Sequence, residues 1–107
     1  MIGGEGRGFA AIMTLMPQER LSQAIMGQAS MQRAMDDAIT FTKDRKAFGQ
    51  PVFDFQNTQF VLADIATSLQ VGWSHLDWAI NRHVAGKLTP VEASAAKLWH
   101  TETQWAA

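Results

Sequence analysis

The residues best suited to chemistry gather in the stretch Asp44-Arg45-Lys46-Ala47-Phe48-Gly49-Gln50-Pro51, which is soon followed by Asp54-Phe55-Gln56. Arg45 carries a guanidinium, a planar fork of donors that suits oxyanions. Gly49 and Pro51 favour a turn and the end of a preceding helix. One interpretation is that this stretch binds an anionic group. The other is that it is only a helix–loop–helix corner with a solvated basic end, which would have the same composition. The stretch taken alone leaves both interpretations open.

Metal and thiol chemistry are not expected. No two of His75, His83 and His100 are three or four residues apart, and no Glu is followed by His at the third position, so a diiron-type carboxylate bundle is disfavoured. His83 falls on an apolar seam, where a core or interface histidine is the expected role. The chain has no Cys, which removes disulfides, thiol catalysis and thiolate metal sites.

Helical spacing accounts for nearly the whole chain, and period-2 runs are absent from the sequence. We therefore predict an all-α, up-and-down helical bundle with three long helices and a short N-terminal helix. The expected elements are a mobile glycine-rich lead-in at 1–8, a short helix at 9–16, a helix at 17–46, a loop at 47–54, a helix at 55–86 and a helix at 89–107 that the chain end truncates.

Start and stop signals support these boundaries. Pro17 suits the first position of a helix, and Asp54 is a candidate N-cap for the helix that follows the loop. Gly86 suits the left-handed residue that ends a helix. Thr89, followed by proline and then by Glu92 three residues after the cap, has the spacing of a capping box.

Apolar and small residues recur every three or four positions on both central helices, which is typical of an antiparallel helix pair. The stripes are Ala24, Gly27, Met31, Ala34, Ala38 and Phe41 on the first and Leu62, Ile65, Leu69, Gly72, Leu76, Ala79 and His83 on the second. Four Trp and six Met are many for so small a helical protein, so we expect some of this apolar surface to contact another chain.

Composition narrows the class of protein further. A chain of 107 residues with 47% hydrophobic and 18% charged residues fits one small globular domain. Its formal net charge of -1 argues against a nucleic-acid partner. The sequence has no apolar run of the ~20 residues that span a bilayer, so we expect a soluble, cytoplasmic protein without a membrane span.

The pattern Arg-Lys-Ala-Phe-Gly at 45–49, followed after six residues by Gln56, resembles the hallmark of the acyl-CoA dehydrogenase family, in its C-terminal helical domain. The resemblance extends from Gly6-Arg7-Gly8-Phe9 to Lys97-Leu98-Trp99. The family domain continues into a further helix beyond the position of residue 107. The resemblance therefore implies a fragment, long-chain-like in type, of a much longer enzyme.

The resemblance implies roles for three residues of the loop region. Arg45 matches the arginine that reaches the FAD pyrophosphate of a neighbouring subunit, and Phe48 and Gln56 match positions that contact the same cofactor. The implied reaction is α,β-dehydrogenation of an acyl-CoA thioester in fatty-acid oxidation. A carboxylate removes the α-proton in a dry pocket, and FAD accepts the β-hydrogen as hydride.

The residues at 17–21, Pro-Gln-Glu-Arg-Leu, match the long-chain pattern, which makes Glu19 the implied catalytic base. An ordinary first-turn Glu stabilised by the helix dipole is the alternative. Arg20 matches a family arginine near the acyl-CoA pocket, or is a surface cation. The implied substrate-channel residues, for which plain core packing is the alternative, are Phe9, Met13 and Met16.

Two functions from different classes follow. The first is part of an FAD-dependent acyl-CoA dehydrogenase that assembles as a homo-oligomer, dimer or tetramer, and passes electrons to an electron-transfer flavoprotein, as the resemblance implies. The other is a catalytically inactive helical bundle that self-associates as a structural or interaction module. Both hold if ancestry and present activity differ. On either account we expect the 107-residue chain alone to be inactive.

Overall fold

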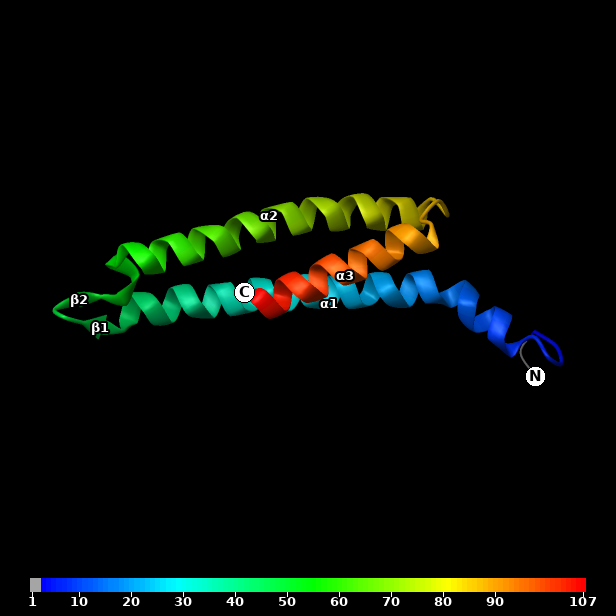
Figure 1. Ribbon diagram of the computed structural model, residues 1–107, viewed down its shortest axis with the longest axis horizontal. Coiled ribbons are helices and arrows are strands. Elements are labelled where there is room, and N and C mark those ends of the chain that lie inside the picture. Colours follow the sequence, from blue (N-terminus) through cyan, green and yellow to red (C-terminus); the bar gives the residue numbers. More distant parts are fainter. Residues whose placement is uncertain (1–2) are drawn as a thin grey trace.

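A computed structural model describes residues 3–107 as an elongated bundle of three helices, with principal extents of 69 × 24 × 17 Å. The helices are α1 (Gly8–Asp44), α2 (Gln56–Val84) and α3 (Pro90–Ala106). Between α1 and α2 lie two-residue strands β1 (Lys46–Ala47) and β2 (Gln50–Pro51), followed by the 3-10 helix η1 (Val52–Asp54). Figure 1 shows α2 running back along α1, and α3 turning again to lie beside α1. The predicted all-α, up-and-down bundle is confirmed.

The short N-terminal helix predicted at 9–16 is not a separate element. It is the first part of α1, which runs for 37 residues with Pro17 inside it. Proline lacks the N–H that would bond the preceding turn, and its ring crowds that turn, so it bends a helix that it does not end. Figure 1 shows the first turns of α1, in blue, directed away from the line of the remaining helix. Of the lead-in predicted at 1–8, residues 1 and 2 lie outside the described residues.

The corner between α1 and α2 is tighter than the predicted loop. Strands β1 and β2 pair antiparallel, with Lys46 opposite Pro51 and Ala47 opposite Gln50. The two residues between the strands both have positive φ, 53° at Phe48 and 83° at Gly49. This is the backbone of a type I′ hairpin turn, which glycine adopts readily and phenylalanine does not.

The prediction that Asp54 caps α2 is wrong. Asp54 is the last residue of η1 and is itself in a helical turn, whereas an N-cap residue needs an extended backbone. The N-cap position is taken by Phe55, with φ −73° and ψ 128°, whose side chain has no hydrogen-bonding atom. The sequence signal was misplaced by one residue because the 3-10 turn was not anticipated.

The predicted signals around the α2–α3 connection are confirmed. Gly86 has φ 67° just after α2. At the start of α3, Glu92 N donates to Thr89 Oγ1 at 3.2 Å and Thr89 N donates to Glu92 Oε2 at 2.7 Å, which completes the capping box. The Thr89 backbone N–H lowers the pKa of the Glu92 carboxyl. Arg82 Nη2 lies 3.0 Å from Glu92 Oε1, which connects the end of α2 to α3.

The core lies in two clusters, one shared by all three helices and the other between α1 and α2, and most of the predicted seam of α2 is buried. One cluster consists of Leu21, Ala24, Leu76, Ala79 and Ala96, and the other of Met31, Met35, Leu62 and Leu69. The predicted stripe of α1 fails at Ala34 and at Phe41, which is 64% exposed. The C-terminus lies beside the middle of α1 (Figure 1), so the second half of α1 lacks α3 as a neighbour.

Candidate functional site

The proposed substrate residues lie on the N-terminal third of α1, and the structure brings part of the set together. Met16, Glu19 and Arg20 line one open groove of about 290 Å³. Phe9 and Met13, from the same predicted set, are exposed on the first turns of α1 and are not among the residues that line it. The groove therefore unites the candidate base with the candidate arginine, but with only one of the three channel residues.

Lys97 of α3 also lines this groove, together with Gln23 of α1, and sequence reasoning assigned it no role. The groove thus contains two cations, Arg20 and Lys97, beside the single carboxylate of Glu19. Such a balance favours an anionic ligand. Nothing in the local spacing predicts the contribution of Lys97, since it depends on how α3 crosses α1.

Glu19 is exposed, whereas a base for a thioester α-proton was expected in a dry pocket. The residues that line its groove leave it open to solvent. Polypeptide other than residues 3–107 would therefore have to exclude water from Glu19.

The proposed cofactor residues lie at the other end of the molecule. Arg45 caps the end of α1, Phe48 is at the hairpin tip, and Gln56 is the first residue of α2. All three are exposed, and Phe48 is fully so. The hairpin fixes their positions, because Val52 N donates to the Arg45 carbonyl at 2.8 Å and the Phe48 ring meets the Phe55 ring edge-on at 6.3 Å.

These three residues fit one edge of a dinucleotide cofactor. A free guanidinium suits a pyrophosphate, an exposed ring suits a planar group, and a carboxamide supplies a donor and an acceptor. One arginine and one ring do not enclose such a ligand. The three residues therefore suit only part of such a ligand.

The two candidate clusters are far apart on one helix. Glu19 and Arg45 are separated by 26 residues, and α1 is continuous up to Asp44. At 1.5 Å per residue they lie about 39 Å apart along the helix axis. The groove at Glu19 and the hairpin at Arg45 therefore cannot belong to one site within one chain.

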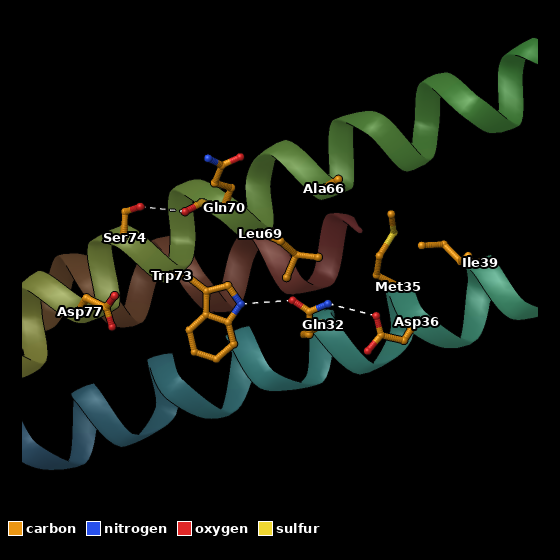
Figure 2. A pocket seen from close by; sticks show the side chains of 10 residues that line it. All are labelled: Gln32, Met35, Asp36, Ile39, Ala66, Leu69, Gln70, Trp73, Ser74 and Asp77. Carbon is orange, nitrogen blue, oxygen red and sulfur yellow. Dashed lines mark hydrogen bonds between the residues drawn. The ribbon is translucent and has the colours of Figure 1, made fainter.

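Sequence reasoning missed a groove of about 510 Å³ that lies between α1 and α2 (Figure 2). Trp73 Nε1 donates to Gln32 Oε1 at 3.2 Å, and Gln32 Nε2 donates to Asp36 Oδ1 at 3.1 Å, so a short polar chain crosses from α2 to α1. The apolar lining includes Met35, Ile39, Ala66 and Leu69. A second groove of about 390 Å³, lined mainly by apolar side chains, shares Met35, Ile39 and Ala66 with it.

The three histidines lie on α2 and α3. Within the described part of the chain, no three of the His, Asp and Glu side chains are grouped to hold a metal ion. His83 is half-buried near the end of α2, and His100 is fully buried between helices. Sequence reasoning considered His100 only as a metal candidate and did not predict its burial.

Comparison with known proteins places nearly the whole chain in one domain type. A family model described as acyl-CoA dehydrogenase, C-terminal domain, matches residues 6–107. The mitochondrial long-chain specific acyl-CoA dehydrogenase of Sus scrofa is 33% identical over 104 residues, covering 97% of this chain and 24% of that protein. A subunit of the caffeyl-CoA reductase-Etf complex of Acetobacterium woodii is 34% identical over 101 residues, covering 94% of this chain and 27% of the subunit.

A solved structure gives the same result. The crystal structure of acyl-CoA dehydrogenase from Geobacillus kaustophilus superposes with a TM-score of 0.91 and 40% identity, over 95% of this chain and 27% of that one. The chain thus spans about a quarter of the length of the relatives it matches. Among residues 3–107, no helix is both long enough and apolar enough to cross a membrane.

Proposed function

Because this chain belongs to the acyl-CoA dehydrogenase family, we propose that it contributes FAD contacts, acyl-CoA contacts and a subunit interface to an enzyme that dehydrogenates acyl-CoA thioesters in fatty-acid oxidation. The observation that carries the proposal is the separation of about 39 Å between Glu19 and Arg45 on one continuous helix. Each complete site then takes its carboxylate from one chain and its arginine from another. A homo-oligomer, dimer or tetramer, is a requirement of this arrangement.

In the proposed site, Glu19 takes the α-proton of the thioester, and Arg20 and Lys97 attract the negatively charged coenzyme A portion to the groove. Arg45 pairs with the pyrophosphate of the cofactor bound to the neighbouring subunit, while Phe48 and Gln56 position it. FAD, when bound, supplies the acceptor for the β-hydrogen. The chain segments that correspond to the other three quarters of the relatives exclude water from Glu19.

Two features of the relatives bear on the partners and the location. One belongs to a complex whose description includes Etf, and we propose an electron-transfer flavoprotein as the electron acceptor here as well. The Sus scrofa relative is described as mitochondrial. The cytoplasmic location expected from the sequence stays a prediction.

A graft tests the proposal. Residues 6–107 replace the matching segment of the Sus scrofa long-chain enzyme, and FAD content and turnover of a long-chain acyl-CoA are measured with an artificial electron acceptor. We expect the graft to retain FAD and to turn over. In the graft, Glu19→Gln lowers kcat by about 10²-fold or more, as removal of a general base does, and keeps the FAD, whereas Glu102→Gln, the matched control at an exposed carboxylate of α3 outside the groove, does not abolish turnover. A folded graft that binds no FAD would contradict the proposal, and full activity in the Glu19→Gln graft would refute the base assignment.

The alternative, an inactive self-associating bundle, is favoured by one observation. Apolar side chains of α1 and α2 line two open grooves that share Met35 and Ile39. Sedimentation of the purified chain at micromolar concentration tests self-association, and a monomer there would count against it. An acyl-CoA turnover assay on the same sample tests the expectation that the chain alone is inactive, and measurable turnover would refute it.

A further inference from the structure

Gln28 connects all three helices at the centre of the fold. It lies on α1 and is fully buried. Its Nε2 donates to the Leu69 carbonyl of α2 at 2.8 Å, and its Oε1 lies 3.0 Å from His100 Nδ1 of α3. The proposed function uses neither Gln28 nor His100.

The orientation of Gln28 decides which nitrogen of His100 carries the hydrogen. A carboxamide oxygen only accepts, so Nδ1 of His100 is the donor and Nε2 is left with a bare lone pair. His100 is fully buried, and among the described residues its Nε2 has no hydrogen-bond partner. Protonation would place an N–H and a positive charge on a buried atom that has no acceptor beside it among the described residues.

The side chains stacked on or hydrogen-bonded to the His100 ring carry no negative charge. From α2, the His75 ring stacks on it with centroids 5.4 Å apart. From α1, it faces the neutral carboxamide of Gln28 and the backbone of Gly27. A Cβ added at Gly27 would lie only 3.1 Å from the His100 carbonyl oxygen. On α3 itself, Trp99 lies edge-on at 4.8 Å. Burial, and then the charge of His75, lower the pKa of His100 to about 4.

The stacked rings of His100 and His75 continue to Trp78 at the surface, and this row adds no negative charge beside His100. His75 stacks on Trp78 at 5.7 Å, and the Arg82 guanidinium lies 5.3 Å from the Trp78 ring. Glu92, the nearest carboxylate in the row, is already paired with Arg82 at 3.0 Å. The titratable groups that reach toward His100 along this row are therefore cationic when charged, or neutralised.

We propose that the Gln28–His100 hydrogen bond is a proton-sensitive lock, which holds α3 on α1 and α2 while His100 is neutral and loosens α3 when His100 is protonated. The lock also acts on the groove at Glu19. Lys97 lies one turn before His100 on α3 and forms the α3 wall of that groove. Loosening α3 therefore withdraws Lys97 and opens the groove. The lock itself depends only on the fold and stands whether or not the chain serves a dehydrogenase.

Nitrogen NMR of the 15N-labelled wild-type chain tests the protonation state directly. We expect His100 to show the tautomer with hydrogen on Nδ1 and to remain neutral down to about pH 5. The opposite tautomer at His100, or titration of His100 in the ordinary histidine range, would overturn the proposal.

Amide hydrogen exchange tests the loosening of α3, after correction for the intrinsic pH dependence of exchange. Between about pH 7 and pH 4, we expect protection in α3 to fall at least tenfold more than protection in the paired parts of α1 and α2. In the Gln28→Leu/His100→Leu double variant, which replaces the buried polar pair by apolar groups, this extra loss should disappear. An equal loss of α3 protection in that variant would overturn the lock. If the double variant does not fold, the tautomer and titration of the wild-type His100 decide.

Discussion

Gly72 of α2 provides the space that the Gln28 side chain occupies: a Cβ at Gly72 would clash with the Gln28 carboxamide at Oε1, Cδ and Nε2. Because Gln28 is fully buried and held by contacts at both ends of its carboxamide, it cannot move aside without losing them. The close approach of α1 and α2 around Gln28 therefore depends on residue 72 being a glycine, which has no side chain.

Gly72→Ala should therefore lower the free energy of unfolding by about 1–3 kcal/mol, although alanine is the better helix former. Urea denaturation measures the change. Gly8→Ala is the control, since among residues 3–107 a Cβ built there lies within 4 Å of no heavy atom other than those of Gly8 itself, its two chain neighbours and the adjacent helix backbone. If the Gly72 variant is as stable as the Gly8 variant, the packing described around Gln28 is wrong.

Acid should destabilise the chain through His100. Its pKa is about 4 in the folded chain, against an ordinary value of 6.5, so the unfolded chain binds more protons between these values. Stability from this residue is complete above about pH 6.5, decreases as the pH falls, and is lost below about pH 4. The two pKa values limit the loss to about 3 kcal/mol.

Carboxylates also gain protons between about pH 6.5 and pH 4. The contribution of His100 is therefore measured as the difference in unfolding free energy between two proteins. Urea denaturation from about pH 7 to pH 4 compares the wild type with the Gln28→Leu/His100→Leu variant. We expect the wild type to lose more stability by up to the stated amount. Parallel pH profiles for the two proteins would show that His100 does not titrate as described.

Local signals in the sequence predicted what local physics decides. The capping box of Thr89 and Glu92 was identified because both partners lie within four residues of each other. Pro17 was misread as a helix start because its neighbours, and not its own chemistry, decide whether a proline ends a helix or bends it. The prediction that Asp54 caps α2 was wrong because the 3-10 turn η1 places the N-cap one residue later, at Phe55.

The contacts of the candidate site depend on distant parts of the chain. Lys97 joins the groove of Glu19, and His100 reaches Gln28 across 72 residues, only because α3 crosses α1 where both helices present small residues. No spacing rule encodes that crossing. The resemblance at 45–49 indicated Arg45 and the resemblance at 17–21 indicated Glu19, yet the continuity of α1, which sets the distance between them, needed the structure.

The capping box makes a measurable contribution to stability. Thr89→Ala removes the acceptor for Glu92 N and should lower the free energy of unfolding by about 1 kcal/mol. Thr67→Ala, in the exposed middle of α2, is the control and should change stability by less than about 0.5 kcal/mol. Thermal unfolding followed by circular dichroism distinguishes them, and equal effects would argue against the cap.

Phe48 combines backbone strain with full exposure, which indicates that the residue is kept for contact rather than for folding. Phe48→Asn creates an Asn-Gly pair, the favoured sequence of a type I′ turn, and should raise stability by about 0.5–1 kcal/mol. The same variant should bind FAD more weakly, because the ring is lost. Calorimetry and a flavin titration measure the two effects, and a less stable variant would contradict the assigned turn.

The central claim is that the hairpin end of this chain carries half of an FAD site. The most direct test titrates the purified chain into FAD and follows flavin fluorescence anisotropy, with Arg45→Ala as the variant and Lys87→Ala, an exposed cation at the opposite end of α2, as the charge-matched control. We predict a saturable rise that Lys87→Ala keeps and Arg45→Ala abolishes. A flat titration at high micromolar protein, or a rise that survives Arg45→Ala, would contradict the claim.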